Sequence, residues 1–394
     1  MESQSSANYE GFSLVSGGLI YSLTSIFRGK SHDAKGLRRT ALALVLISWL
    51  PLLVMAIQSE TMQSQDGSAG FLLDLPLHAR FLLAVPFLIL IERAVDWAFL
   101  RYIQRSDDLI PAEQQESYNR LVRLLDKLTD SWLPEGILLV LVYGFTVLNW
   151  EALAAESAGR LTFMKPDGVT LQPAGWYLLL VSAPIFQLLV FRWVWRWMVW
   201  AFSILRISRF KIKVDPLHAD RMAGLAYVNL CPLTFSFILM APTAVVSATL
   251  GYRLIFLGET FSDYIIPIFV YVFTLSILLY LPLVAFTPLL VRAKADGIGS
   301  FGTLLRAHNL AYVKKWIESP PPADEPLLGS VDNSSLSDIN GSYAPLHEMM
   351  PFPFDLRMFG VTLVLALLPF LPLVFAEYSA TEVLTALINS LVGG

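Results

Sequence analysis

The stretch KVDPLHADRMAGL, residues 213–225, holds four ionisable side chains that could do chemistry together: Asp215, His218, Asp220 and Arg221. Asp215 and His218 are three residues apart, so one helical turn would bring them close enough to share a proton or a cation. A histidine beside a carboxylate changes its charge near neutral pH, which suits a gate or a proton relay. Carboxylates and imidazole are also ligands that divalent metals accept. No HExxH motif or cysteine pair accompanies them, so we expect no metal site.

The same charges also fit the beginning of a membrane helix. Asp215 followed by Pro216 matches an N-cap and a first helical residue, and Asp220 could begin the helix equally well. The positive end of the helix dipole favours a carboxylate at either position. Arg221 agrees with the rule that the cytoplasmic ends of membrane helices are basic. A helix beginning and a charged cytoplasmic vestibule are therefore both open interpretations.

Two further pairs of charges lie inside apolar segments. Glu92 and Asp96 are four residues apart, and so are Arg192 and Arg196, so each pair shares one face of its helix. Charges at membrane depth pair with one another or line a polar pathway. The tryptophans of FRWVWRWMVW, residues 191–200, offer the arginines a third role, in an aromatic belt from which they reach lipid phosphates. The pattern thus predicts an ion pair between two helices, a polar pathway or an interfacial belt.

The composition identifies the solvent around these helices. Of 394 residues, 55% are hydrophobic and 15% are charged, and the mean hydropathy is +0.58. A soluble domain carries about 25% charged residues. The net charge of −4 lacks the basic footprint of a nucleic-acid-binding protein. We therefore expect an integral membrane protein with the lipid bilayer as partner, no nucleic-acid partner and no cofactor.

Seven segments are apolar enough to cross a ~30 Å hydrocarbon core, which takes about 20 helical residues. They are residues 40–57, 77–100, 133–150, 174–194, 223–251, 264–291 and 358–376. Lysine and arginine are enriched on the cytoplasmic side of membrane proteins. Segments 1–39, 101–131, 206–221 and 292–357 carry 21 of the 28 lysines and arginines, and the alternate segments 58–80, 151–173, 251–263 and 377–394 carry 4. The sequence therefore predicts an all-α fold of seven spans, with the amino end inside and the carboxyl end outside.

Two of the predicted cytoplasmic segments have a helical pattern of their own. Apolar residues recur at helical spacing in 107–132 and again in 301–319, which predicts two amphipathic helices. Ser335 and Asp338 are spaced like a capping box that opens another short helix. The chain then divides into a cytoplasmic segment 1–39, a six-span region 40–291 with the helix at 107–132, a cytoplasmic helical segment 292–357, and a last span with an outer tail, 358–394.

Three stretches resemble a family of multi-pass bacterial inner-membrane proteins. They are DPLHADRMAGL, FGTLLRAHNLAYVKKWI and EPLLGSVDNSSLSDINGSYAPLHEMMPFPFD, and the family carries a DPLHPDRAGGL-like motif. Here Ala219 stands where the family has a proline, Met222 and Ala223 replace its small pair, and Gly224 remains. The resemblance covers the order of motifs over most of the chain. It implies the bacterial cytoplasmic membrane, and it implies no activity because the family is mostly uncharacterised.

Three functions fit these observations. The leading expectation is a channel or transporter for an ion or small solute, for which all eight charged residues named above are pathway or gate candidates. The second is a non-catalytic scaffold or sensor that binds a protein partner through its cytoplasmic segments. The third is an intramembrane enzyme with His218 and Asp220 as acid and base, which is less favoured because no nucleophile or phosphate-binding loop accompanies them. A homo-oligomer is compatible with each.

Overall fold

The computed structural model describes residues 13–28, 34–63, 70–148, 163, 170–319 and 331–377. These residues form helices and connecting turns, and no strand occurs among them. Within this part of the chain, six continuous helical stretches are long and apolar enough to cross a membrane: Ala34–Gln58, Leu75–Leu109, Pro173–Ile207, Ala226–Phe256, Phe261–Glu318 and Leu356–Phe375. The structure therefore has the all-helical, multi-pass character that the sequence predicts.

The third predicted span, 133–150, is described as far as Leu148. Its described part forms α7, Leu133–Leu148, whose 16 residues reach about 24 Å at ~1.5 Å per residue. α7 packs against α10, Ala183–Ile207, and against the amino-terminal helix α1, Leu19–Arg28. The count of seven spans and the inside–outside orientation stay predictions.

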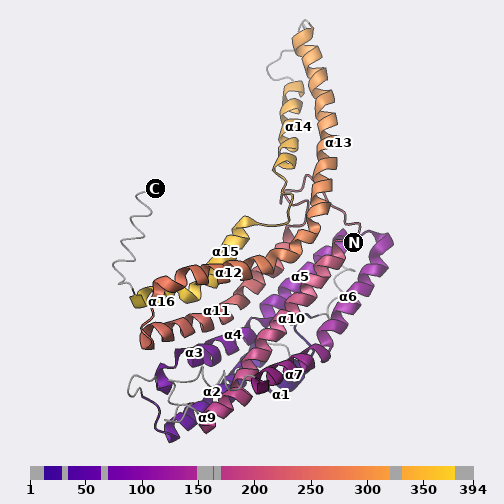
Figure 1. Cartoon of the computed structure of the whole chain (residues 1–394). Coiled ribbons are helices and arrows are strands. Elements are labelled where there is room, and N and C mark those ends of the chain that lie inside the picture. The colour runs from indigo at the N-terminus through magenta and orange to yellow at the C-terminus, as the bar shows by residue number, and fades with distance from the viewer. Residues whose placement is uncertain are drawn as a thin grey trace.

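One half of the bundle is formed by helices that precede residue 208 (Figure 1). In it, α6, Gln115–Asp130, packs against α10 and against α5, Glu92–Leu109. The amphipathic helix predicted within 107–132 is α6, because its apolar side, with Tyr118 and Leu125, is fully buried. The Tyr118 hydroxyl donates a hydrogen bond of 2.6 Å to the carbonyl of Ile103 on α5. This bond satisfies the one polar atom that the helix buries at that point.

The other half is built around α11, Leu230–Phe256. α11 packs on α5 on one side and on α15, Leu356–Leu367, on the other, with α12, Ile265–Tyr280, beside both (Figure 1). The apolar core lies where α11 meets α10 and α4, Val85–Leu90. α11 does not begin at residue 223 as predicted. Its first turn begins at Ala226, because residues 221, 223 and 224 have positive φ angles that no right-handed helix contains.

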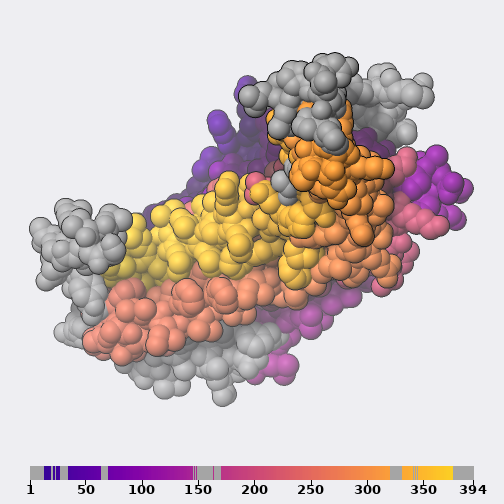
Figure 2. Space-filling model, turned by 90° about the horizontal axis from the view of Figure 1, so that it is seen from above, coloured from indigo at the N-terminus to yellow at the C-terminus, as the bar shows by residue number. Residues whose placement is uncertain are grey.

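A helical hairpin projects from this bundle. It consists of α13, Thr287–Val313, with a last turn at Lys314–Glu318, and α14, Val331–Glu348, which lies alongside it (Figure 1). Figure 2 looks down on the hairpin, which stands near one end of the elongated bundle. The predicted capping box at Ser335 and Asp338 is wrong, since both residues lie inside α14. The first turn of α14 instead holds Asp332, whose Oδ2 accepts hydrogen bonds from the Lys315 ammonium (2.6 Å) and the Trp316 indole (3.1 Å).

Candidate functional site

The membrane-embedded charges form one closed cluster. Arg192 and Arg196 of α10 are 2% and 1% exposed, and Glu92 of α5 and Glu135 of α7 are 2% and 1% exposed. The Arg192 Nη1 lies 2.6 Å from the Glu92 Oε1. The Glu135 Oε1 lies 3.5 Å from the Arg192 Nε and 3.9 Å from the Arg196 Nη2. The predicted pairing of Arg192 with Glu92 is confirmed, and the belt interpretation is wrong because neither arginine reaches the surface.

The backbone of the amino-terminal segment, residues 13–18, completes this cluster. The carbonyl of Val15 accepts a hydrogen bond from the Arg192 Nη2 (2.6 Å), and that of Gly17 accepts one from the Arg196 Nη2 (3.1 Å). The Arg196 Nη1 donates to the carbonyl of Thr129, at the end of α6 (2.7 Å). Carbonyl oxygens thus supply acceptors to three of the guanidinium nitrogens, in addition to the acceptors of the two glutamates.

Two glycines let this segment approach the charges. Gly17 and Gly18 have φ angles of +93° and +88°, a conformation that glycine adopts without steric cost. A Cβ atom on Gly18 would lie 2.6 Å from the Glu135 Oε1, and one on Gly17 would lie 2.6 Å from the Asp130 Cα. Only glycine therefore fits both the backbone angle and the space at these positions.

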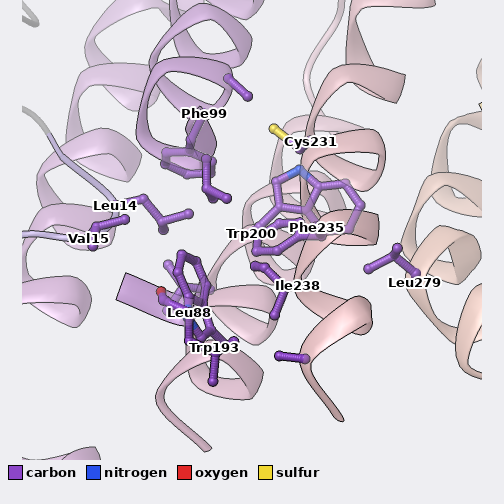
Figure 3. Packing of buried hydrophobic residues seen from close by; sticks show 14 of the residues in the cluster. Leu14, Val15, Leu88, Phe99, Trp193, Trp200, Cys231, Phe235, Ile238 and Leu279 are labelled. Atoms are coloured by element: carbon purple, nitrogen blue, oxygen red, sulfur yellow. The ribbon is translucent and has the colours of Figure 1, made fainter. Parts of the chain in front are cut away.

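Asp96, predicted to share a pathway with Glu92, holds the amino-terminal segment instead. Its Oδ1 accepts hydrogen bonds from the Ser13 hydroxyl (2.8 Å) and from the amide of Leu14 (2.7 Å). The side chains of Leu14 and Val15 are buried and point toward the apolar cluster that contains Leu88 (Figure 3). Hydrogen bonds to the Asp96 carboxylate thus hold residues 13–18 on one side, and the apolar packing of Leu14 and Val15 holds them on the other.

The loop at 213–225 is organised by Asp220 rather than by a helix. Its Oδ1 accepts the amides of Met222 (2.9 Å) and Gly224 (3.1 Å), and its Oδ2 accepts the amide of Ala226 (3.0 Å). Burial opposes ionisation of this carboxyl, but these amides and the ring of His218 hold the pKa of Asp220 below its ordinary value. The left-handed backbone at Arg221 and Ala223 is what turns the three amides toward one carboxylate.

His218 pairs with a different carboxylate from the predicted one. Its Nδ1 lies 2.9 Å from the Asp220 Oδ1. Asp215 forms a local turn instead, in which its Oδ1 accepts the amide of Leu217 (3.0 Å) and its own amide donates to the carbonyl of Ala223 (3.2 Å). Neither aspartate begins a helix, so that interpretation of the motif is wrong. In the part of the chain that the structure describes, no group of three or more potential ligands is placed to hold a metal.

The same loop joins the hairpin to the bundle. The Arg221 Nη2 lies 2.8 Å from the Glu348 Oε2, and the carbonyl of Arg221 accepts the amide of Met350 (2.8 Å). From α13, the Lys294 ammonium donates to the carbonyls of His347 (2.9 Å) and Met349 (2.7 Å) at the end of α14. We call these contacts the hairpin clamp. Both helices of the hairpin are therefore attached, at their base, to one another and to the loop.

Pro216 packs into the base of the hairpin. A Cβ atom on Gly297 of α13 would lie 3.0 Å from the Pro216 Cβ and 2.8 Å from the Leu346 Cδ2 of α14. The missing side chain at Gly297 is what lets the loop and α14 reach α13 at the same point. The motif thus takes part, through Pro216, in a packing contact between three segments of the chain: the loop, α13 and α14.

Glu135 and residues 13–18 also belong to the site, although the sequence predicts neither. Glu135 follows Leu133 and Pro134 at the beginning of an apolar segment, where a lone carboxylate is typical of a solvated helix start. The only local signal for the amino-terminal segment is the pair Gly17-Gly18. The contacts of Glu135 and of residues 13–18 with the arginines depend on how segments distant in the sequence pack together. Local sequence patterns carry no information on that packing.

Comparison of the chain with protein-family models, with known proteins and with solved structures gives no significant match. The family resemblance carried by the motif at 215–225 therefore stays a prediction.

Proposed function

We propose that this chain is a scaffold of the bacterial cytoplasmic membrane, which presents the α13–α14 hairpin to a protein partner on the cytoplasmic side. The hairpin clamp is the observation that carries the proposal. Arg221 binds Glu348 and Met350 and so joins the end of α14 to the loop, and Lys294 joins α13 to the end of α14. An arm attached at both helices keeps one direction relative to the membrane, and a pre-oriented surface binds at a lower entropic cost.

The outer side of α13 has the character of a protein-binding surface. Leu304, Leu310 and Ile317 are exposed, and Ile317 is 71% exposed. Leu310 and Ile317 are seven residues apart and therefore lie close together on the helix surface, whereas the indole of Trp316 is turned toward Asp332 of α14. Exposed apolar side chains on a helix are typical of recognition by an apolar groove or by a second helix. We call this surface the α13 face.

Permeation has less support than scaffolding. The embedded charges are bound to one another and to the carbonyls of residues 13–18, so an ion path through them would have to displace that segment. The charges at 215–221 are engaged in the turn around Asp220 and in the hairpin clamp. An enzyme that used His218 and Asp220 would need a substrate cavity beside them, and neither residue lines the cavity between α10 and α12, the one beside residues 352–354, or the one between residues 75–87 and α11.

The test is site-specific photocrosslinking in intact membranes. A photoreactive phenylalanine analogue replaces Leu304, Leu310 or Ile317, and the controls carry it at the exposed α14 residues Ser334 and Ser337. We expect the three α13 positions to give an adduct with one partner protein, which Leu310→Glu abolishes at the other two positions while the protein stays in the membrane. Adducts of equal yield from the α14 controls, or an adduct with a second copy of this chain alone, would contradict the proposal.

A measurement of ion flux separates the scaffold from the channel. The purified protein is reconstituted in planar bilayers under gradients of K⁺, Na⁺, Cl⁻ and protons. The scaffold proposal expects no selective current from the wild-type protein. A selective current from the wild-type protein would overturn the proposal and restore permeation.

A further inference from the structure

An apolar cleft lies between α10 and α12, with α11 as its floor. Its volume is about 290 Å³. Val194 and Trp197 of α10 line one wall, Leu278 and Leu279 of α12 line the other, and Ile238 of α11 lies beneath. Among the described residues that line it, none is charged. This cleft is separate from the charge cluster and from the hairpin clamp.

The cleft arises because α10 and α12 meet only near one end. α10 contacts the turn that follows α12, Leu281–Phe286, whereas the rest of α12 packs on α11 and α15. The two helices diverge from that turn and leave a wedge between them. Phe235 and Ile238 line the cleft from α11 and Leu279 lines it from α12; Figure 3 labels these three residues among the buried side chains around them.

On the α10 side of the cleft, a hydrogen bond and aromatic packing hold Trp193 in place. The indole of Trp193 donates to the carbonyl of Leu88 (3.1 Å) and lies edge-on to Phe235, with ring centroids 6.4 Å apart. Trp200 lies on the other side of the same phenylalanine, at 5.8 Å. The Trp193 side chain, bonded at its polar end and packed against Phe235, cannot swing inward to fill the wedge. The cleft is therefore a preformed feature of the packing.

The mouth of the cleft opens at the outer surface of membrane-spanning helices. Val194 and Leu278 stand on its two sides, and each is 45% exposed. At this depth the surrounding molecules are lipid tails. An apolar cavity offers water no hydrogen-bond partners and stays dry, whereas a methylene chain recovers the contacts that an empty cavity lacks.

The volume agrees with a chain of this kind. The volume of about 290 Å³ is far above the ~10–15 Å³ that one small molecule such as water needs in a cavity, so the cleft has room for a run of methylene groups.

We propose that the cleft between α10 and α12 binds one acyl chain of a membrane lipid. The site is independent of the proposed scaffold function, because no residue of the hairpin lines it. Its ligand is recognised by shape and apolar character alone, so lipids of different headgroup bind if their chains fit.

The test uses a phospholipid with a photoactivatable group midway along one acyl chain, incorporated into nanodiscs with the full-length protein. Val194→Trp fills the mouth of the cleft. Val270→Trp is the matched control, since Val270 is an exposed valine of α12 that does not line the cleft. We expect crosslinked peptides from α10 and α12 at the cleft, with labelling at least fivefold lower in Val194→Trp and unchanged in Val270→Trp.

A second variant and a second measurement keep the result interpretable. Leu278→Trp fills the mouth from the opposite wall and should lower the labelling in the same way. It serves as the test if Val194→Trp does not fold. Native mass spectrometry of protein in detergent should show one lipid retained by the wild type and by Val270→Trp, and none by the filled variants. Labelling that is spread evenly over the lipid-facing helices and is unchanged in both filled variants would overturn the proposal.

Discussion

Arg192 and Glu92 lie 100 residues apart in the chain, and the guanidinium Nη1 of one lies 2.6 Å from the carboxylate Oε1 of the other, with both side chains nearly inaccessible to solvent. The contrast with Arg105 and Asp108 is informative. That pair is 4.0 Å apart and its side chains are 67% and 54% exposed. Burial makes each charge of the first pair dependent on the other, because an unpaired charge at that place has no water to solvate it.

Glu92→Gln should therefore destabilise the protein by about 3 kcal/mol, the usual order for breaking a buried ion pair by changing one partner. Arg105→Gln, which breaks the exposed pair, should change stability by roughly 0–1 kcal/mol. Denaturant unfolding in detergent, followed by tryptophan fluorescence, measures both values. The double change Glu92→Met with Arg192→Met should cost less than the sum of its single changes. Strict additivity would mean that the two groups do not depend on one another.

A second prediction concerns the glycine that faces this cluster. Gly18→Ala should destabilise the protein by about 1–2 kcal/mol or more, because alanine is strained at positive φ and its Cβ would lie 2.6 Å from the Glu135 Oε1. Gly144→Ala on α7 is the control, since nothing lies within 4 Å of the added Cβ. There the change should be neutral or stabilising by up to ~1 kcal/mol, through helix propensity. Thermal unfolding of the two variants side by side measures the difference, and equal melting temperatures would contradict the assigned role of Gly18.

These residues show what local patterns can predict. The i,i+4 spacing of Arg192 and Arg196, and of Glu92 and Asp96, placed each pair on a helix face at membrane depth, so a pairing between helices could be foreseen. The partner of each carboxylate could not be foreseen, because Asp96 binds the amides of an amino-terminal segment 82 residues away. At the motif, Asp215-Pro216 carries a strong local signal for a helix start. The left-handed angles at Arg221 and Ala223 override that signal, and non-glycine residues adopt them only when tertiary contacts hold them there.

The turn around Asp220 should make stability depend on pH in acid. The folded pKa of Asp220 is lowered from 3.8, so the native state binds a proton less readily than the unfolded state. Its contribution is therefore fully present above about pH 4 and is lost as the pH falls through the lower folded value. The stability difference between the wild type and Asp220→Asn, measured from pH 6 down to pH 2.5, should shrink over that acid range. A difference that stays constant with pH would show that the charge of Asp220 is not what the three amides stabilise.

The last prediction concerns the direction of the hairpin relative to the bundle, which the hairpin clamp should control, and not the stability of the protein. Spin labels at Arg123→Cys on α6 and Ser337→Cys on α14, both exposed residues, report the distance between bundle and hairpin in a Cys231→Ala background. Lys294→Met removes two hydrogen bonds from a charged donor to the end of α14, and such bonds contribute about 1.5–3 kcal/mol each. Arg221→Ala removes an ion pair whose side chains are 56% and 52% exposed and leaves the backbone bond to Met350. Double electron–electron resonance should therefore give a clearly broader distance distribution for Lys294→Met than for Arg221→Ala. The opposite order would place the control of hairpin direction in the surface ion pair and not in the partly buried lysine.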